Sequence, residues 1–233
     1  MKQVVKTQLN NMKIDIIAVS KQGDSDKENQ DRFQIYCSDT EIIIAVADGL
    51  GSAPLSGIGA GIACQTAIET ISNNMKFPHD FVKNWKTRIS GDYHDYDTTI
   101  RFLRLINENI KVGCIGDGWT YVLTGLNQCE LHSTSAFLNC TESIMSVADD
   151  SYYKNDELTT NGTFVAILST DGFSEDIDKT HKRELIEDFA ESIDLSSDDF
   201  ANEIEEMLDN WPCKSNFDDK TVVIIRGKNN EKF

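Results

Sequence analysis

Two aspartates flank a pair of apolar segments in the first quarter of the chain. Asp31 directly precedes the alternating segment 32–37, and Asp48 directly follows the apolar run 41–47. If the two segments form a β-hairpin, the start of the first strand lies beside the end of the second. The two carboxylates should then meet at one rim of a sheet.

The same arrangement recurs near the C-terminus. Asp171 follows the apolar run 163–170, and Asp218 precedes the run 220–226. If these are antiparallel neighbours, their acids also share a rim. Four carboxylates on one edge repel each other strongly unless cations lie between them. Oxygen ligands favour hard ions such as Mg²⁺ or Mn²⁺, and two such ions about 3.5–4 Å apart form a general hydrolytic centre for phosphoryl groups.

Each aspartate on its own has an ordinary explanation, because Asp is common at turns and helix caps. Asp48-Gly49 is a turn dipeptide, but a helix-like segment follows it rather than a return strand. This order disfavours a hairpin turn. Gly49 would also let its backbone carbonyl come close to an ion. The repeated pairing of acids favours the metal site.

The remaining pattern predicts a layered α+β domain, because strands dominate the chain and amphipathic helices follow late. We expect strands over 13–20, 32–37, 41–47, 98–107, 109–117, 120–126, 130–135, 163–170 and 220–226. We expect helices over 54–75, 79–89, 181–193 and 198–208. The segment 149–162 is polar and is interpreted as a loop, and no linker divides the 233 residues, which favours one domain over 1–233.

The net charge of −17, from 39 acids and 22 bases, is a poor profile for a protein that binds nucleic acid or anionic lipid. The six cysteines are scattered without a CxxC pair, which disfavours a zinc site. The chain begins without a signal-peptide pattern, and no apolar run approaches 18 residues. We therefore expect a cytoplasmic monomer.

Six short motifs along the chain resemble, in order and spacing, those of metal-dependent serine/threonine protein phosphatases of type 2C (the PPM family) in their compact bacterial form. The motifs are ENQD (28–31), VADGLGS (46–52), DTTI (97–100), IGDGWTYVL (115–123), LSTDGFSED (168–176) and DDKTVVII (218–225). The resemblance covers nearly the whole chain. It implies a four-layer αββα sandwich, in which two antiparallel β-sheets are flanked by helices.

The resemblance also implies ligands for two Mn²⁺ or Mg²⁺ ions. Asp48 would bridge both ions. Asp171 and the first of two adjacent aspartates, Asp218, would hold one ion. Asp31 and the Gly49 carbonyl would hold the other.

A weaker third ion is implied by the same likeness. Asp117 matches the acid that, together with Asp171, holds this ion in the family. Glu175 falls where a further acid for the third ion often lies, although Asp176 could serve instead.

The sequence departs from the family where the substrate phosphate is clamped. The place of a frequent family Arg is taken by Asp26. Lys27 is adjacent and could bind the phosphate, but Lys lacks the bidentate fork of Arg. Gly118 and Trp119 also replace the Ser and Arg of the family's Gly-Asp-Ser-Arg motif.

The implied activity is hydrolysis of phosphoserine or phosphothreonine in proteins, by direct attack of a metal-bridging hydroxide without a phosphoenzyme. Bacterial relatives of this size often work opposite a protein kinase or on regulators of sigma factors. One alternative is a weakly active or non-catalytic phosphatase-like module that binds a partner; the missing Arg suggests it, and the retained acids argue against it. Another is a metal-dependent hydrolase of small phosphate esters.

Overall fold

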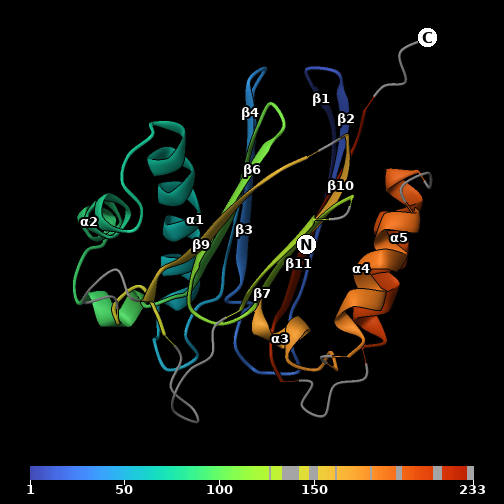
Figure 1. The fold of residues 1–233 in the computed structure, drawn as a ribbon. Helices are drawn as coiled ribbons and strands as arrows, with labels where there is room; N and C mark the ends of the chain where they lie inside the picture. The colour runs from blue at the N-terminus through green and yellow to red at the C-terminus, as the bar shows by residue number, and fades with distance from the viewer. Residues whose placement is uncertain are drawn as a thin grey trace.

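Two antiparallel β-sheets pack face to face between two layers of helices (Figure 1). This arrangement confirms the predicted α+β, four-layer αββα sandwich. The structure is a computed structural model that describes residues 1–125, 127–132, 142–146, 152–160, 162–178, 180–192, 196–211 and 217–229.

The first sheet has six strands, all joined in antiparallel pairs. In spatial order they are β1 (Lys2–Leu9), β2 (Met12–Lys21), β11 (Lys220–Asn229), β10 (Thr163–Ser169), β7 (Trp119–Thr124) and β8 (Asn127–His132). The second sheet has five strands, also antiparallel. In spatial order they are β3 (Arg32–Cys37), β4 (Glu41–Ala47), β5 (Ile100–Ile106), β6 (Asn109–Ile115) and β9 (Lys154–Thr159).

The helices divide between the outer faces of the two sheets (Figure 1). Helices α1 (Ser56–Ser72) and α2 (His79–Arg88) lie on the side of the five-stranded sheet, and α4 (Lys182–Glu191) and α5 (Ser197–Asp209) cover the six-stranded sheet. Two short helices, η1 (Tyr93–Tyr96) and α3 (Asp171–Ser174), complete the described elements. None of the described helices combines the length and apolar character needed to cross a membrane.

Strand β4 shows why the central strands are continuously apolar. Ile44 and Val46 face the core between the sheets, whereas Ile43 and Ala45 face the core beneath α1. Both faces of this strand are therefore covered, and all of its residues are buried. Alternation between polar and apolar residues is lost for that reason.

Two edge strands differ from the expectation. β9 lies inside the segment 149–162, which was predicted to be a loop, and β1 was not predicted. The sequence of β9, KNDELT, is polar and mostly exposed, because the strand pairs with β6 at the edge of the sheet and packs Leu158 against the core. Such a strand has no apolar period from which it could be recognised.

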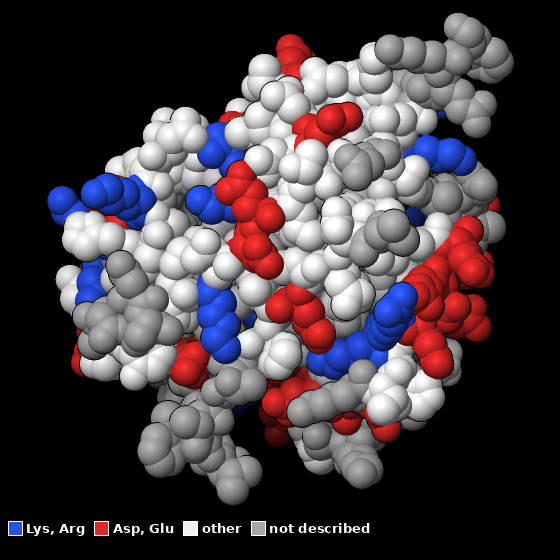
Figure 2. Space-filling view, viewed as in Figure 1, with Lys and Arg blue, Asp and Glu red and all other residues white. Residues whose placement is uncertain are grey.

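Charge is unevenly distributed over the surface. Figure 2 shows Asp and Glu side chains gathered over the α4 and α5 layer and Lys and Arg side chains over α2. The excess of acidic side chains is therefore concentrated on part of the surface.

Candidate metal centre

The first pair of acids meets as the hairpin predicts. In the β3–β4 ladder Arg32 is opposite Ala47, so Asp31 and Asp48 are adjacent at the end of the two strands. The side chains of Asp31 and Asp48 lie within hydrogen-bonding reach of each other.

The second pair belongs to the other sheet. Ser169 of β10 is opposite Val222 of β11, which places Asp171 and Asp218 near each other beyond the strand ends. The expectation of four acids on one rim is therefore wrong in one respect. The two pairs come from different sheets and meet because both sheets end at the same end of the sandwich, beside α3 (Figure 1).

Three carboxylates come together around one point. Asp48, Asp117 and Asp171 each offer an oxygen, and these atoms lie within 4.8 Å of one another. Asp117 is presented by the turn between β6 and β7, where Gly116 and Gly118 have φ angles of +97° and +95°. Only glycine adopts such angles without strain, so the two glycines allow the sharp turn that carries Asp117.

Asp31 is the most deeply buried acid of the centre, with 1% of its surface exposed. Its Oδ2 accepts a hydrogen bond of 2.8 Å from the Thr170 hydroxyl. Its Oδ1 is buried and receives no hydrogen bond from the residues that the structure describes. Burial raises the pKa of Asp31 to about 7, the Thr170 hydrogen bond opposes this shift, and the charge of Asp219 adds to it.

The neighbouring acids are shifted in the same direction. The pKa of Asp48 is raised well above its ordinary value by burial first, and then by the charges of Asp31 and Asp171. Burial, with the charge of Asp171, raises the pKa of Asp218 to about 6. A buried carboxylate oxygen without a donor, among oxygen ligands that repel each other, fits a hard divalent cation.

The backbone at Gly49 is held close to its neighbours. Gly49 forms an isolated antiparallel bridge with Thr98, in which the Asp48 carbonyl accepts from the Thr99 amide at 2.8 Å. Gly49 and Thr98 form a non-hydrogen-bonded pair, so the Gly49 carbonyl points away from Thr98. A Cβ at Gly49 would lie 2.7 Å from the Ser56 backbone, which excludes a side chain. The dipeptide is not a hairpin turn.

The two adjacent aspartates have different surroundings. Asp219 accepts hydrogen bonds from the Gly23 amide at 2.9 Å and the Gln30 amide at 2.6 Å. Both of its oxygens therefore hold the loop that leads to Asp31. Asp218 is more exposed than Asp219, and its Oδ1 accepts a hydrogen bond of 3.0 Å from the Asp219 amide. The sequence analysis missed this role of Asp219, which no pattern within the motif reveals.

Arg101 of β5 is a further residue that the sequence analysis missed. Its guanidinium is buried, donates to the Thr120 hydroxyl at 2.9 Å and bonds the backbone carbonyl of Asp117. A Cβ at Gly118 would lie 2.7 Å from this guanidinium, so the glycine that replaces the family Ser leaves room for Arg101. The sequence offered one signal for this role, because Arg101 is a charged residue within the predicted strand 98–107.

Two predicted site residues lie at the margin of the acid group. Lys27 is exposed, and its Nζ donates to the Gly51 carbonyl at 2.5 Å. Glu175 follows α3, and its pKa is raised by burial and then by the charges of Asp171 and Asp176. Glu175 is therefore close to Asp171, whereas Lys27 contacts the loop that follows β4.

Comparison with known proteins gives the family. A family model described as Protein phosphatase 2C matches residues 21–209. The chain belongs to the protein phosphatase 2C family. A search of curated proteins finds no match.

Solved structures of phosphatases of this family share the fold at low identity. RsbX in complex with magnesium is 16% identical with a TM-score of 0.71, over 98% of this chain and 100% of that chain. The S. agalactiae serine/threonine phosphatase is 17% identical with a TM-score of 0.62, over 91% and 98%. The catalytic domain of PstP in complex with two manganese ions is 13% identical with a TM-score of 0.58, over 94% and 100%. The predicted assignment to the metal-dependent protein phosphatases is confirmed.

Proposed function

We propose that Asp48 is the shared ligand of two divalent ions, Mg²⁺ or Mn²⁺. Asp171 and Asp218 would hold one ion, and Asp31 and the Gly49 carbonyl would hold the other. The position of Asp48 between Asp31 and Asp171, each within hydrogen-bonding reach of its carboxyl, supports the bridging role.

The chain's own residues would prepare this centre before a metal binds. Thr170 orients Asp31 through its 2.8 Å hydrogen bond, and Asp219 holds the loop before Asp31. When bound, two such ions lower the pKa of a water and neutralise the oxygens of a phosphoryl group. The fixed positions of the ligands avoid reorganisation during the reaction.

A weaker third ion would be held by Asp117 together with Asp171. Asp117 lies within the group of three carboxylates that includes Asp48 and Asp171. Glu175 would be the further acid, with Asp176 as the alternative. The raised pKa of Glu175, due to burial and the charge of Asp171, supports the choice of Glu175.

The proposed substrate is a phosphoserine or phosphothreonine of a regulatory protein. Lys27 would contact the phosphate through a single ammonium group. A cleft of about 400 Å³ lies beside it and is lined by both Lys27 and Arg32, so it could receive the peptide around the phosphate. Among the similar folds are one reported with the bacterial stressosome and the phosphatase domain of SpoIIE from Bacillus subtilis, which favours a regulatory substrate here.

We also propose that 1–233 is a single catalytic domain acting as a cytoplasmic monomer. β1 and β11 lie outside the matched region 21–209, yet both belong to the six-stranded sheet. The described cysteines are unpaired, which suits a reducing compartment.

The proposal rests on the carboxylates that gather from both sheets around Asp48. Removal of the Asp48 carboxylate tests it. We expect Asp48→Asn to lower kcat on a phosphothreonine peptide with Mn²⁺ by about 10²-fold or more, as loss of a main charge-stabilising group does. Asp198→Asn is the control, because the contact that Asp198 makes within the described residues is an exposed ion pair with Lys6. Equal turnover by the Asp48 variant and wild type would refute the assignment.

Assays of the wild type separate the competing functions. Mn²⁺-dependent turnover of the phosphopeptide, abolished by EDTA, is expected of a protein phosphatase. Turnover of p-nitrophenyl phosphate alone would indicate a hydrolase of small esters. Metal binding without turnover of either substrate would support the non-catalytic module, for which Asp26 at the family Arg position is the one observation.

A further inference from the structure

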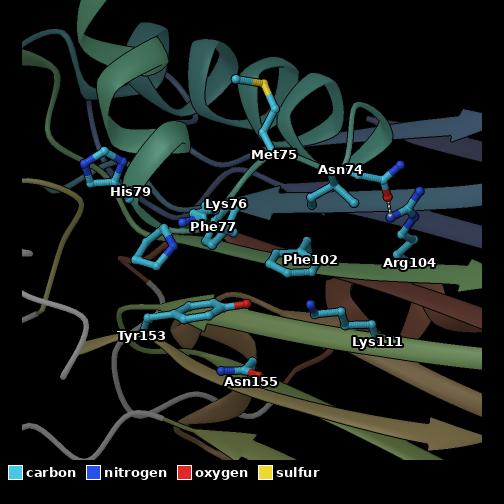
Figure 3. A pocket seen from close by; sticks show the side chains of 12 residues that line it. Asn74, Met75, Lys76, Phe77, His79, Phe102, Arg104, Lys111, Tyr153 and Asn155 are labelled. Carbon is cyan, nitrogen blue, oxygen red and sulfur yellow. Dashed lines mark hydrogen bonds between the residues drawn. The ribbon is translucent and has the colours of Figure 1, made fainter.

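A second cavity opens on the outer face of the five-stranded sheet, separate from the acids (Figure 3). Its volume is about 500 Å³, and its walls come from the α1–α2 connection, β5, β6 and the start of β9. Arg104 lines it and stands five positions beyond Thr99, which bonds Asp48. At about 3.4 Å per strand residue, this corresponds to about 17 Å from the metal centre.

The floor of the cavity is a set of packed aromatic rings. The Phe77 ring lies 4.8 Å from the Phe102 ring and 5.2 Å from the Tyr153 ring, measured between centroids. Gly113 of β6 makes this packing possible, since a Cβ there would lie 2.6 Å from Phe102 and 2.8 Å from Tyr153. The chain's own side chains therefore form the floor.

The walls carry positive charge. Lys76, Arg104 and Lys111 line the cavity, and no carboxylate does so among the described residues. This reverses the balance of a chain with a net charge of −17. Figure 3 shows the Lys111 ammonium group and the Tyr153 hydroxyl pointing toward one another.

Arg104 is fixed in this wall. Its Nε and Nη2 contact Glu41 Oε2 at 2.8 and 2.7 Å, and its Nη1 donates to Asn74 Oδ1 at 2.7 Å. These contacts leave further N–H donors, because a guanidinium has five. A pre-oriented guanidinium binds an anion at a smaller entropic cost than a mobile side chain.

We propose that this cavity binds a small anion that carries an aromatic ring. The ring would stack against Phe77 and Tyr153, which are partly exposed, whereas Phe102 is buried beneath them. Aromatic pairs gain energy beyond their buried area. The carboxylate, phosphate or sulfonate of the ligand would contact Arg104 and Lys111 through charge-assisted hydrogen bonds. The volume lies within the range of small-molecule sites, about 300–1,000 Å³.

The test uses 1-anilinonaphthalene-8-sulfonate as an aromatic anion and N-phenyl-1-naphthylamine as its uncharged counterpart. In EDTA, we expect saturable one-to-one binding of the sulfonate by fluorescence and weaker binding of the amine. Lys111→Gln should weaken sulfonate binding about fivefold, as loss of one charged contact does. Lys13→Gln is the matched control, because Lys13 is exposed on β2 away from the cavity.

A second variant blocks the space without altering the core. Asn155 lines the cavity from the exposed edge strand β9, so Asn155→Trp should abolish binding while thermal unfolding and turnover of p-nitrophenyl phosphate stay unchanged. Wild-type affinity in both Lys111→Gln and Asn155→Trp, or equal affinity for the two probes, would overturn the proposal. Asp48→Asn should bind the sulfonate normally, so failure here is distinct from failure of the phosphatase assignment.

Discussion

The carboxylates of the centre depend on neighbouring residues to which the sequence analysis gave no role. Asp31 is oriented by Thr170, and the loop before it is held by Asp219. The residue types at 31, 48, 171 and 218 predicted a cation site. The different roles of Asp218 and Asp219 follow only from the positions of Gly23 and Gln30, which lie almost 200 residues away in sequence.

Replacement of Asp219 tests whether it holds the loop before Asp31. Asp219→Ala leaves the amides of Gly23 and Gln30 without their acceptor. We expect a loss of about 1.5–3 kcal/mol in the free energy of unfolding, the usual contribution of hydrogen bonds to a charged group. Urea denaturation of the metal-free protein measures it. Asp198→Ala should change stability by less than about 0.5 kcal/mol, and a similarly small effect at Asp219 would contradict its role.

At the scale of elements, the two sheets are joined at the metal end by a buried cation. Arg101 belongs to β5, whereas its hydrogen-bond partners are Thr120 of β7 and the turn residue Asp117. The side chain therefore connects the five-stranded sheet to the six-stranded sheet. It also places a positive charge beside the acids. Burial lowers the pKa of Arg101, and the electrostatic effects of Cys114 and then of Asp117, Asp171 and Asp48 oppose this shift.

Removal of this connection should destabilise the protein strongly. Arg101→Met leaves the Thr120 hydroxyl and the Asp117 carbonyl without their buried donor, and the expected loss is about 1.5–3 kcal/mol, the usual contribution of hydrogen bonds to a charged group. The comparison is Arg183→Met, because the ion pair of Arg183 with Glu187 on α4 is exposed. Thermal unfolding of both variants measures the difference. Equal stability of the two would show that Arg101 does not join the sheets energetically.

For the whole molecule, the metal-free centre links stability to pH. Burial raises the pKa of Asp31 from 3.8 to about 7 and that of Asp218 to about 6. The folded state therefore binds protons more tightly than the unfolded state. This contribution is complete below about pH 4 and is lost as the pH rises through 7.

We therefore expect the metal-free protein to lose stability between pH 6 and pH 8. Asp31 alone accounts for about 1 kcal/mol of this loss. Unfolding temperatures in EDTA measure it, and Mn²⁺ should restore more stability at pH 8 than at pH 6. Asp31→Asn should flatten the profile. A metal-free wild type that is more stable at pH 8 than at pH 6 would contradict the raised pKa values.

The sequence by itself determined the strands that carry the acids, the pairing of Asp31 with Asp48 and of Asp171 with Asp218, and the family. These features rest on local hydrophobic patterns and on motif order, which are properties of the linear chain. Only the tertiary structure decided that the two pairs lie on different sheets, that Arg101 and Asp219 support them, and that β9 exists. Each of these depends on contacts between distant segments, which leave no periodic signal in the sequence. The aromatic cavity has the same origin, because Phe77, Phe102 and Tyr153 meet only when the α1–α2 connection packs over β5 and β6.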